Sequence, residues 1–208
     1  RQEELDECES LLKKLYEKTN CDYVKARYAG LYWDKDDYIK EDKAKFDSIM
    51  LTLTESKDPF TLKNVGGVYK SGENMDGDKA ISYFTKAYEL GSAGSAYQLA
   101  AGYLFGWYNK KADKKKAVEW FKKGVERLST DCMIEYGDLC MDDSKDNKQY
   151  YNPSLGIAMF QKAAKLNSGQ AFDKLGCMYT FGTGVDVNNE LATQYFKKAM
   201  ERKDANGT

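Results

Sequence analysis

One aromatic residue recurs at nearly constant spacing, and this feature most restricts the folds that the chain can adopt. Phenylalanine returns after 37, 39 and 36 residues, at Phe84, Phe121, Phe160 and Phe196. An aromatic residue or Met precedes each of these Phe residues, and small residues lie four positions before and three positions after it. Such spacings place the side chains on one face of a helix. A period of this length is typical of arrays of short helices that bury their apolar faces only by stacking on neighbouring units.

A second series of positions has a similar period and lies before each Phe. Its members, separated by 34, 37 and 39 residues, are Tyr69, Tyr103, Cys140 and Tyr179. Three positions before each of them the residue is small: Gly66, Ala100, Gly137 and Gly176. Small side chains at fixed places let two helices approach closely. The two series together predict an all-α fold, an α-solenoid built from antiparallel helix pairs.

The stretch from Ala171 to Ala199 carries this pattern most completely. Its sequence is AFDKLGCMYTFGTGVDVNNELATQYFKKA, in which two helical patterns flank a turn with two glycines. This stretch resembles the Sel-one-like repeat (SLR), a relative of the tetratricopeptide repeat (TPR). Residues 61–91 and 95–128 also resemble it well, whereas residues 132–167 match its second helix well and its first helix poorly. The resemblance implies an SLR/TPR-like right-handed superhelix and a role as adaptor or scaffold, because most SLR proteins act in this way.

The repeat pattern also predicts how the chain is divided. Residues 1–20 form an N-terminal capping helix by the spacing of their apolar residues, and residues 21–56 form a degenerate first repeat. Four SLR-type repeats follow at about 57–92, 93–129, 130–167 and 168–203, and residues 204–208 form a frayed tail.

The composition argues against several classes of partner. The chain has 208 residues, of which 42% are hydrophobic and 31% are charged, and its net charge is −1. Because acidic and basic residues are interspersed, no overall field favours nucleic acid or a membrane. No apolar run approaches the ~18 residues that span a bilayer, so membrane insertion is not expected. The ends of a solenoid expose stacking faces that can drive dimers, so the oligomeric state stays open.

The 5 cysteines are odd in number and irregularly placed, which argues against a full disulfide framework. One branch of the SLR family pairs cysteines eight residues apart, which is the spacing of Cys132 and Cys140. Both are predicted to lie on one helix, about two turns apart and too distant to bridge. Reduced thiols packed as small apolar residues are therefore expected, which favours the cytoplasm. A periplasmic or secreted location stays open if a signal peptide preceded Arg1.

The sequence lacks the usual catalytic and metal-binding motifs. It contains 0 His, which removes the commonest general base and zinc ligand. It also has neither a Cys-x-x-Cys pair nor a GxxxxGK[ST] phosphate loop. We therefore predict that the chain is not an enzyme and has no cofactor and no metal site.

The resemblance further implies a binding surface, because the first helices of related repeats line a concave groove. The positions concerned lie one and two residues before the Leu of the motif and two residues after it. The candidate groove residues are Arg27, Trp33, Lys63, Asn64, Tyr97, Gln98, Glu135, Asp138, Asp173 and Lys174, with Gly67, Ala101, Ile134 and Cys177 in the same series. Such a mixture of polar, charged and aromatic side chains suits protein or peptide binding, and plain solvent exposure is the alternative for each residue.

A turn rich in large side chains is a second candidate surface. Leu104, Phe105, Trp107 and Tyr108 surround Gly106 at the end of a predicted first helix. They either pack between neighbouring repeats or form an exposed patch that contacts a partner. The sequence leaves both possibilities open.

The function predicted from these features is a non-catalytic scaffold or adaptor that binds a protein or peptide along the concave face. One alternative is a hydrolase acting on peptidoglycan-like or β-lactam substrates, as proposed for some SLR proteins. It would have to use Ser, Lys or carboxylates, and would need a pocket with close Ser–Lys or Glu–Asp pairs of shifted pKa. Another alternative is a purely structural spacer.

Overall fold

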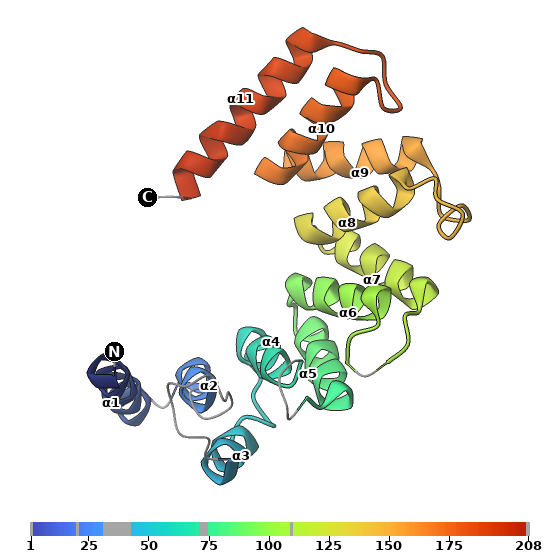
Figure 1. Ribbon diagram of the computed structural model, residues 1–208. Helices are drawn as coiled ribbons and strands as arrows, with labels where there is room; N and C mark the ends of the chain where they lie inside the picture. Colours follow the sequence, from blue (N-terminus) through green and yellow to red (C-terminus); the bar gives the residue numbers. More distant parts are fainter. Residues whose placement is uncertain (1, 20, 31–42, 71–74, 109, 207–208) are drawn as a thin grey trace. The chain divides into compact units, whose positions relative to one another are not determined.

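The protein is all-helical, as predicted. The computed structural model describes residues 2–19, 21–30, 43–70, 75–108 and 110–206. These residues form 11 helices, α1 to α11, and no strand among them (Figure 1). The chain divides into two compact units, residues 1–117 and residues 118–208. Each unit is described separately.

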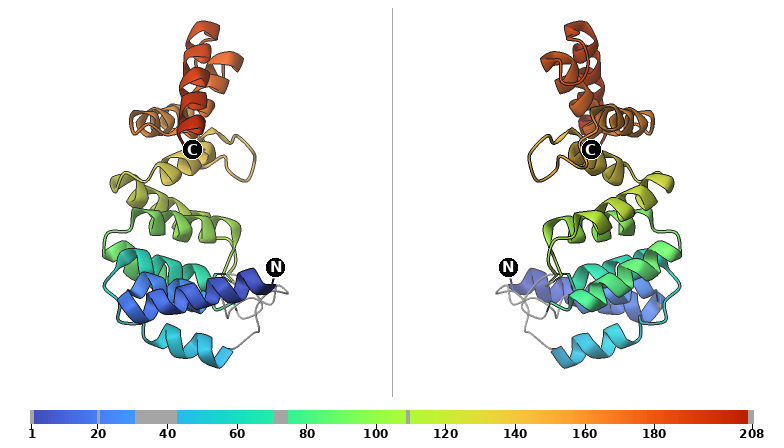
Figure 2. Two further views of the ribbon diagram at one scale, coloured as in Figure 1. Left: turned by 90° about the vertical axis from the view of Figure 1, so that its left-hand side faces the viewer. Right: turned by 90° about the vertical axis from the view of Figure 1, so that its right-hand side faces the viewer.

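The first unit contains helices α1 to α6 and the beginning of α7. Their bounds are α1 (Gln2–Thr19), α2 (Asp22–Gly30), α3 (Lys43–Leu51), α4 (Pro59–Val68), α5 (Gly77–Glu89), α6 (Ala93–Phe105) and α7 (Lys114–Glu126). α1 packs on α2, and α2 packs on both α3 and α4. α4, α5 and α6 then pack in chain order, as the views of Figures 1 and 2 show.

The second unit contains the remainder of α7 and four further helices. These are α8 (Thr130–Met141), α9 (Pro153–Lys165), α10 (Gly169–Phe181) and α11 (Asn189–Asn206). α8 packs on α9, α9 on α10, and α10 on α11. No helix among the described residues is both long enough and apolar enough to cross a membrane.

Capping side chains explain where the regular helices begin. The carboxylate of Asp58 accepts a hydrogen bond from the backbone N–H of Thr61 at 2.8 Å, at the start of α4. The side chain of Asn152 accepts one from the N–H of Leu155 at 3.1 Å, at the start of α9. Both helices have Pro in their first turn, where its missing N–H costs nothing. Serine side chains cap α8 and α10 in the same way.

The two repeated series of the sequence meet in the structure at Phe84, Phe160 and Phe196, each of which lies against the glycine of the helix before it. A Cβ atom added to Gly66 of α4 would lie 2.9 Å from the ring of Phe84 in α5. The same contact recurs at 2.6 Å between Gly137 of α8 and Phe160 of α9, and at 2.7 Å between Gly176 of α10 and Phe196 of α11. The Gly and the Phe are therefore one packing unit, and this explains why they recur together.

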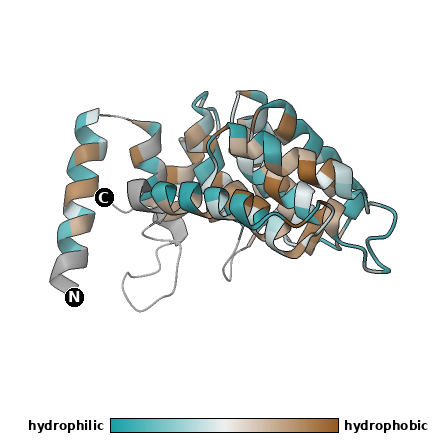
Figure 3. Cartoon of the chain, turned by 90° about the horizontal axis from the view of Figure 1, so that it is seen from above, coloured by the Kyte–Doolittle hydropathy of each residue, from teal (hydrophilic) through white to brown (hydrophobic). Residues whose placement is uncertain are grey.

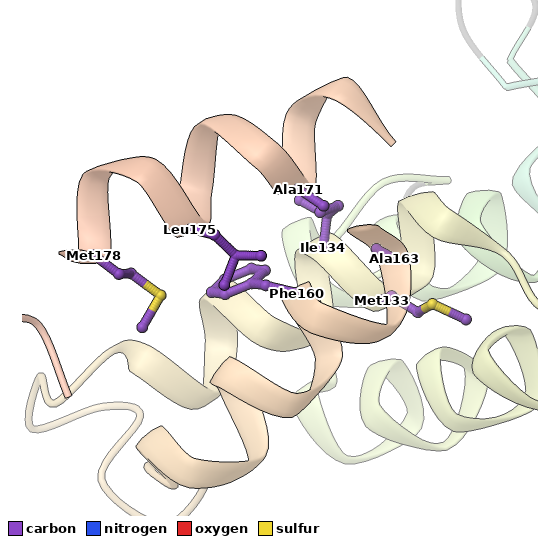
Figure 4. Close-up of a cluster of buried hydrophobic side chains, with 7 residues drawn as sticks. All are labelled: Met133, Ile134, Phe160, Ala163, Ala171, Leu175 and Met178. Atoms are coloured by element: carbon purple, nitrogen blue, oxygen red, sulfur yellow. The ribbon is translucent and has the colours of Figure 1, made fainter. Parts of the chain in front are cut away.

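The core of the second unit is built from α8, α9 and α10. Figure 4 shows the buried side chains that form it: Met133, Ile134, Phe160, Ala163, Ala171, Leu175 and Met178. Phe160 lies next to Leu175 at the centre of this cluster. Leu175 of α10 thus packs on Phe160 of the preceding pair, which ties one repeat to the next.

The C-terminal end differs from the expected frayed tail. α11 continues to Asn206, past the expected end of the last repeat. No Gly or Pro interrupts residues 200–206, so the sequence offers no residue that would stop the helix before Gly207.

Candidate protein-binding surfaces

The predicted groove residues of the first unit come from α4 and α6. Lys63 and Asn64 lie on α4, Tyr97 and Gln98 lie on α6, and all four side chains are half-buried. The ammonium group of Lys63 lies beside Gly94 at the beginning of α6. The two helices therefore bring these side chains onto one surface, which we call the α4/α6 surface.

Lys70 joins this surface, although the sequence analysis did not select it. Its ammonium group donates a hydrogen bond to Gln98 Oε1 at 3.1 Å and lies 4.2 Å from the centre of the Trp107 ring. Burial lowers the pKa of Lys70. The sequence does distinguish Lys70, because it is the one charged residue at this position of the four repeats. The other three repeats have Leu104, Met141 and Thr180 there.

The aromatic turn divides into exposed and packed residues. Phe105 is 59% exposed, and its ring centre lies 5.5 Å from that of Trp107. Leu104 and Trp107 are half-buried. Phe105 is therefore the member of this turn that is most accessible to a partner, and it lies next to the Trp that contacts Lys70.

Tyr108 belongs to the core and not to an exposed patch. Its side chain is 1% exposed, and its hydroxyl donates a hydrogen bond to the backbone oxygen of Gln98 at 2.8 Å. Two glycines make room for it, since a Cβ on Gly77 or Gly102 would overlap Tyr108 at 1.9 Å. Burial raises the pKa of Tyr108. The sequence left open whether the residues of this turn pack inside the protein or form an exposed patch, and Tyr108 packs inside.

The predicted groove residues of the second unit come from α8 and α10. Glu135 and Asp138 lie on α8, whereas Asp173 and Lys174 lie on α10, and all four are half-buried. Lys174 Nζ lies 2.6 Å from Asp138 Oδ1, and these side chains are 40% and 39% exposed. This ion pair joins two successive first helices. We call the four residues the α8/α10 surface.

The electrostatics of the α8/α10 surface are dominated by its carboxylates. Burial raises the pKa of Glu135, and the neighbouring Asp138 raises it further, while Lys174 acts in the opposite direction. The net effect is a raised pKa for Glu135, with burial as the largest cause.

Other members of the predicted groove series lie elsewhere. Ile134 and Ala101 are 2% and 1% exposed and belong to the cores of their units, so they do not line a groove. Both side chains point into the core, because a fixed offset in the sequence does not report how far each helix is rotated toward its neighbours. Arg27 is exposed on α2, and Trp33 lies outside the described residues.

The two cysteines of α8 are poor candidates for catalytic chemistry. Cys132 and Cys140 lie on α8 and are buried, and burial raises the pKa of Cys132 to about 12. Its thiol is thus protonated at neutral pH and unsuited to act as a nucleophile or metal ligand. Among the described residues, no three His, Cys, Asp or Glu side chains are grouped so that they could hold a metal ion.

A comparison with known families identifies the repeats. The family described as the Sel1 repeat matches residues 66–92, 93–127, 130–168 and 173–204. The chain belongs to the Sel1 repeat family. The resemblance predicted from the sequence is therefore confirmed, and membership of this family suggests a role as a protein-interaction adaptor.

Solved structures of Sel1 repeat proteins share the fold. The Sel1 repeat protein from Oxalobacter formigenes matches with a TM-score of 0.63 and 22% identity, over 79% of this chain and 67% of that protein's chain. The protective antigen c5321 of uropathogenic Escherichia coli, which displays an SLR fold, matches with a TM-score of 0.63 and 18% identity, over 92% and 40% of the two chains. These matches confirm the solenoid of helix pairs.

One curated relative is much longer than this chain. It is the ERAD-associated E3 ubiquitin-protein ligase component HRD3 of Candida glabrata, which is 25% identical over 138 residues. The match covers 62% of this chain but only 16% of that relative.

In the Sel1 repeats of this chain, both candidate surfaces lie on the first helices, and the second helices supply the packed Phe.

Proposed function

We propose that this Sel1 repeat chain is a non-catalytic adaptor that binds protein or peptide segments along its α4/α6 and α8/α10 surfaces. One observation carries the proposal. In each unit a lysine of one repeat contacts a polar side chain on the first helix of an adjacent repeat. Lys70 donates to Gln98 of the following repeat at 3.1 Å, and Lys174 donates to Asp138 of the preceding repeat at 2.6 Å. Both bridges are partly exposed polar contacts, separate from the buried Gly–Phe contacts that pack the helices of a pair together.

The two bridges favour binding because they order long side chains before a partner arrives. A free Lys or Gln side chain loses about 0.5–1.5 kcal/mol of rotamer entropy when a partner immobilises it. The lysine of each bridge is already held by a neighbour in the unbound protein. Part of that entropic cost is therefore met by folding, and more of the contact energy is left to stabilise the complex.

The two surfaces differ in charge and so suit different segments. The α4/α6 surface combines Lys63 and Lys70 with Tyr97 and the nearby Phe105, which fits a segment with carboxylate and apolar side chains. The α8/α10 surface presents three carboxylates and one ammonium group, which fits a basic segment. Such complementarity mainly supports specificity and association rate. The name of the HRD3 relative, a component of a ubiquitin ligase, is consistent with a place in a multi-protein assembly.

The proposal is tested by a pull-down from the native host with three baits. They are the unmodified chain, a Tyr97→Ala/Lys174→Ala variant, and a control variant, Tyr151→Ala/Lys162→Ala. The control removes the same two residue types at exposed positions outside both surfaces. Circular dichroism and thermal melts establish that all three chains fold alike. Any captured protein is then titrated against each bait to show that binding saturates.

Loss of a captured protein with the surface variant and its retention with the control is the expected result. Equal retention by both variants would refute binding at these two surfaces. A Phe105→Ala bait would then show whether the aromatic turn makes the contact instead. If no bait captured any protein, the adaptor function would be rejected in favour of a structural spacer.

A further inference from the structure

The N-terminal helix has an apolar face that its own neighbour does not cover. Tyr16 of α1 stacks on Tyr28 of α2, with ring centres 5.9 Å apart, and this contact defines the side of α1 that faces the fold. On the adjoining side Leu11 is 58% exposed and Leu15 is 45% exposed. Together with Glu7, Cys8 and Leu12 they line a shallow, mostly apolar depression. Figure 3 shows hydrophobic residues along this helix.

The spacing of these residues makes one stripe. Positions 8, 11, 12 and 15 differ by three, four and seven residues, so they lie on the same side of a helix. A stripe of this kind is typical of a helix that packs against a second helix. Covering these leucines with a second helix would stabilise the complex, because fully burying a Leu side chain contributes about 1.5–3 kcal/mol.

The order of charges along the sequence of α1 indicates which helix would cover the stripe. Residues 2–10 include five acidic side chains and no basic one, whereas residues 11–19 include three Lys and one Glu. A helix with an acidic first half and a basic second half complements itself when a second copy runs in the opposite direction. A copy running in the same direction would place like charges side by side.

We propose that α1 pairs with α1 of a second copy of this chain, in antiparallel orientation, with the crossing point at Leu11 and Leu12. About this point residues exchange places symmetrically, so Cys8 faces Leu15 of the second copy. Glu7, which borders the stripe on the same flank as Lys14, then lies near Lys14 of the second copy. The interface is then the same patch on both copies, as closed two-fold dimers require. The net charge of −1 opposes this approach only weakly.

The size of the stripe sets the strength of the pairing. An 18-residue helix is about 27 Å long, and one such helix on each side buries less surface than the ~1,200 Å² of a stable interface. The dimer is therefore expected to be weak and to dissociate on dilution. It is independent of the α4/α6 and α8/α10 surfaces, and loss of partner binding there would leave it unchanged.

The test measures the mass of the full chain by light scattering during gel filtration over a range of concentrations. One variant makes α1 acidic throughout (Lys13→Glu, Lys14→Glu and Lys18→Glu). A second makes the net charge of its first half positive (Glu3→Lys, Glu4→Lys and Glu7→Lys). A control places a similar charge reversal on α11 (Lys197→Glu and Lys198→Glu). Circular dichroism verifies that each variant keeps its helix content.

The antiparallel dimer predicts that the unmodified chain and the α11 control dimerise, that each α1 variant alone is monomeric, and that an equimolar mixture of the two α1 variants dimerises again. Higher salt should reduce the dimer fraction of the unmodified chain, since screening weakens the Glu–Lys contacts. A chain that stays monomeric at all concentrations would overturn the proposal. So would α1 variants that dimerise alone, or an unmodified dimer that is strengthened by salt.

Discussion

Two adjacent glycines in α4 allow the packing of the repeat to be measured directly. Gly66 faces Phe84, and an added Cβ would lie 2.9 Å from two of its ring carbons. Gly67, the next residue, is exposed, and a Cβ there would meet no atom within 4 Å. Gly66→Ala and Gly67→Ala therefore make the same chemical change in the same helix, and only one of them collides with the core.

The expected magnitudes follow from this difference. Ala in place of Gly favours a helix by about 0.8–1 kcal/mol, so Gly67→Ala should stabilise the protein by roughly that amount. Gly66→Ala gains the same stabilisation from helix propensity, but overpacking a well-filled core costs about 1–3 kcal/mol. The ring of Phe84 cannot easily give way, because it is 1% exposed and also contacts Tyr108, with ring centres 6.1 Å apart. The two variants should differ by about 1–3 kcal/mol, with Gly66→Ala the less stable.

The assay is urea unfolding followed by circular dichroism, supported by calorimetry to test whether the two units unfold in one step. Because the helix propensity term is common to both variants, the difference between their unfolding free energies isolates the packing against Phe84. Equal stability of the two variants would refute the reasoning. It would mean that the ring moves aside at no cost, and that the recurrence of Gly at this position has another cause.

Three further changes test individual contacts. Leu128 has a φ of +61° and is 56% exposed, so Leu128→Gly should stabilise the protein by about 0.5–1 kcal/mol in thermal melts, and a lower melting temperature would contradict this. The backbone N–H of Lys79 donates a hydrogen bond to the Asp76 carboxylate and lowers the pKa of Asp76, while burial has a smaller opposing effect. Because the pKa is lowered in the folded protein, this hydrogen bond stabilises the fold above the usual pKa of 3.8. The stabilisation is lost as pH falls through the lowered value. Between about pH 5 and pH 2, the unfolding free energy of the unmodified protein should therefore fall by about 0.5 kcal/mol more than that of Asp76→Asn. The effect is small because the carboxylate is 38% exposed. Equal losses in the two proteins would contradict the assignment. Tyr108→Phe should cost about 1 kcal/mol in urea unfolding by removing the hydrogen bond to Gln98, and an unchanged midpoint would contradict that bond.

Much of the fold could be predicted because the repeat is a local signal seen several times over. Phe84 and its equivalents mark each second helix, and Gly66 and its equivalents mark each first helix. One occurrence would not distinguish a packing contact from chance. Four occurrences at nearly constant spacing do, because each unit must meet its neighbours in the same geometry.

The candidate surfaces could be predicted only in part. Offsets along a helix correctly selected half-buried positions such as Gln98 and Lys174, but they also selected Ile134, which lies in the core. The same offsets passed over Lys70, whose contacts depend on a turn more than thirty residues further along the chain. Spacing reports which residues share a helix face, but not how far that face is rotated toward its neighbour.

The sequence alone determined that the chain is helical, repetitive, free of His and a member of the SLR class, because these properties depend on residue identity and short-range spacing. The tertiary structure decided which large side chains are buried and which are exposed. Tyr108 is enclosed because Gly77 and Gly102, distant from each other in the sequence, leave space at the same point. Leu11 and Leu15 are exposed because α2 contacts the adjoining side of α1. Burial depends on the meeting of distant segments, and no local pattern in the sequence records where those segments meet.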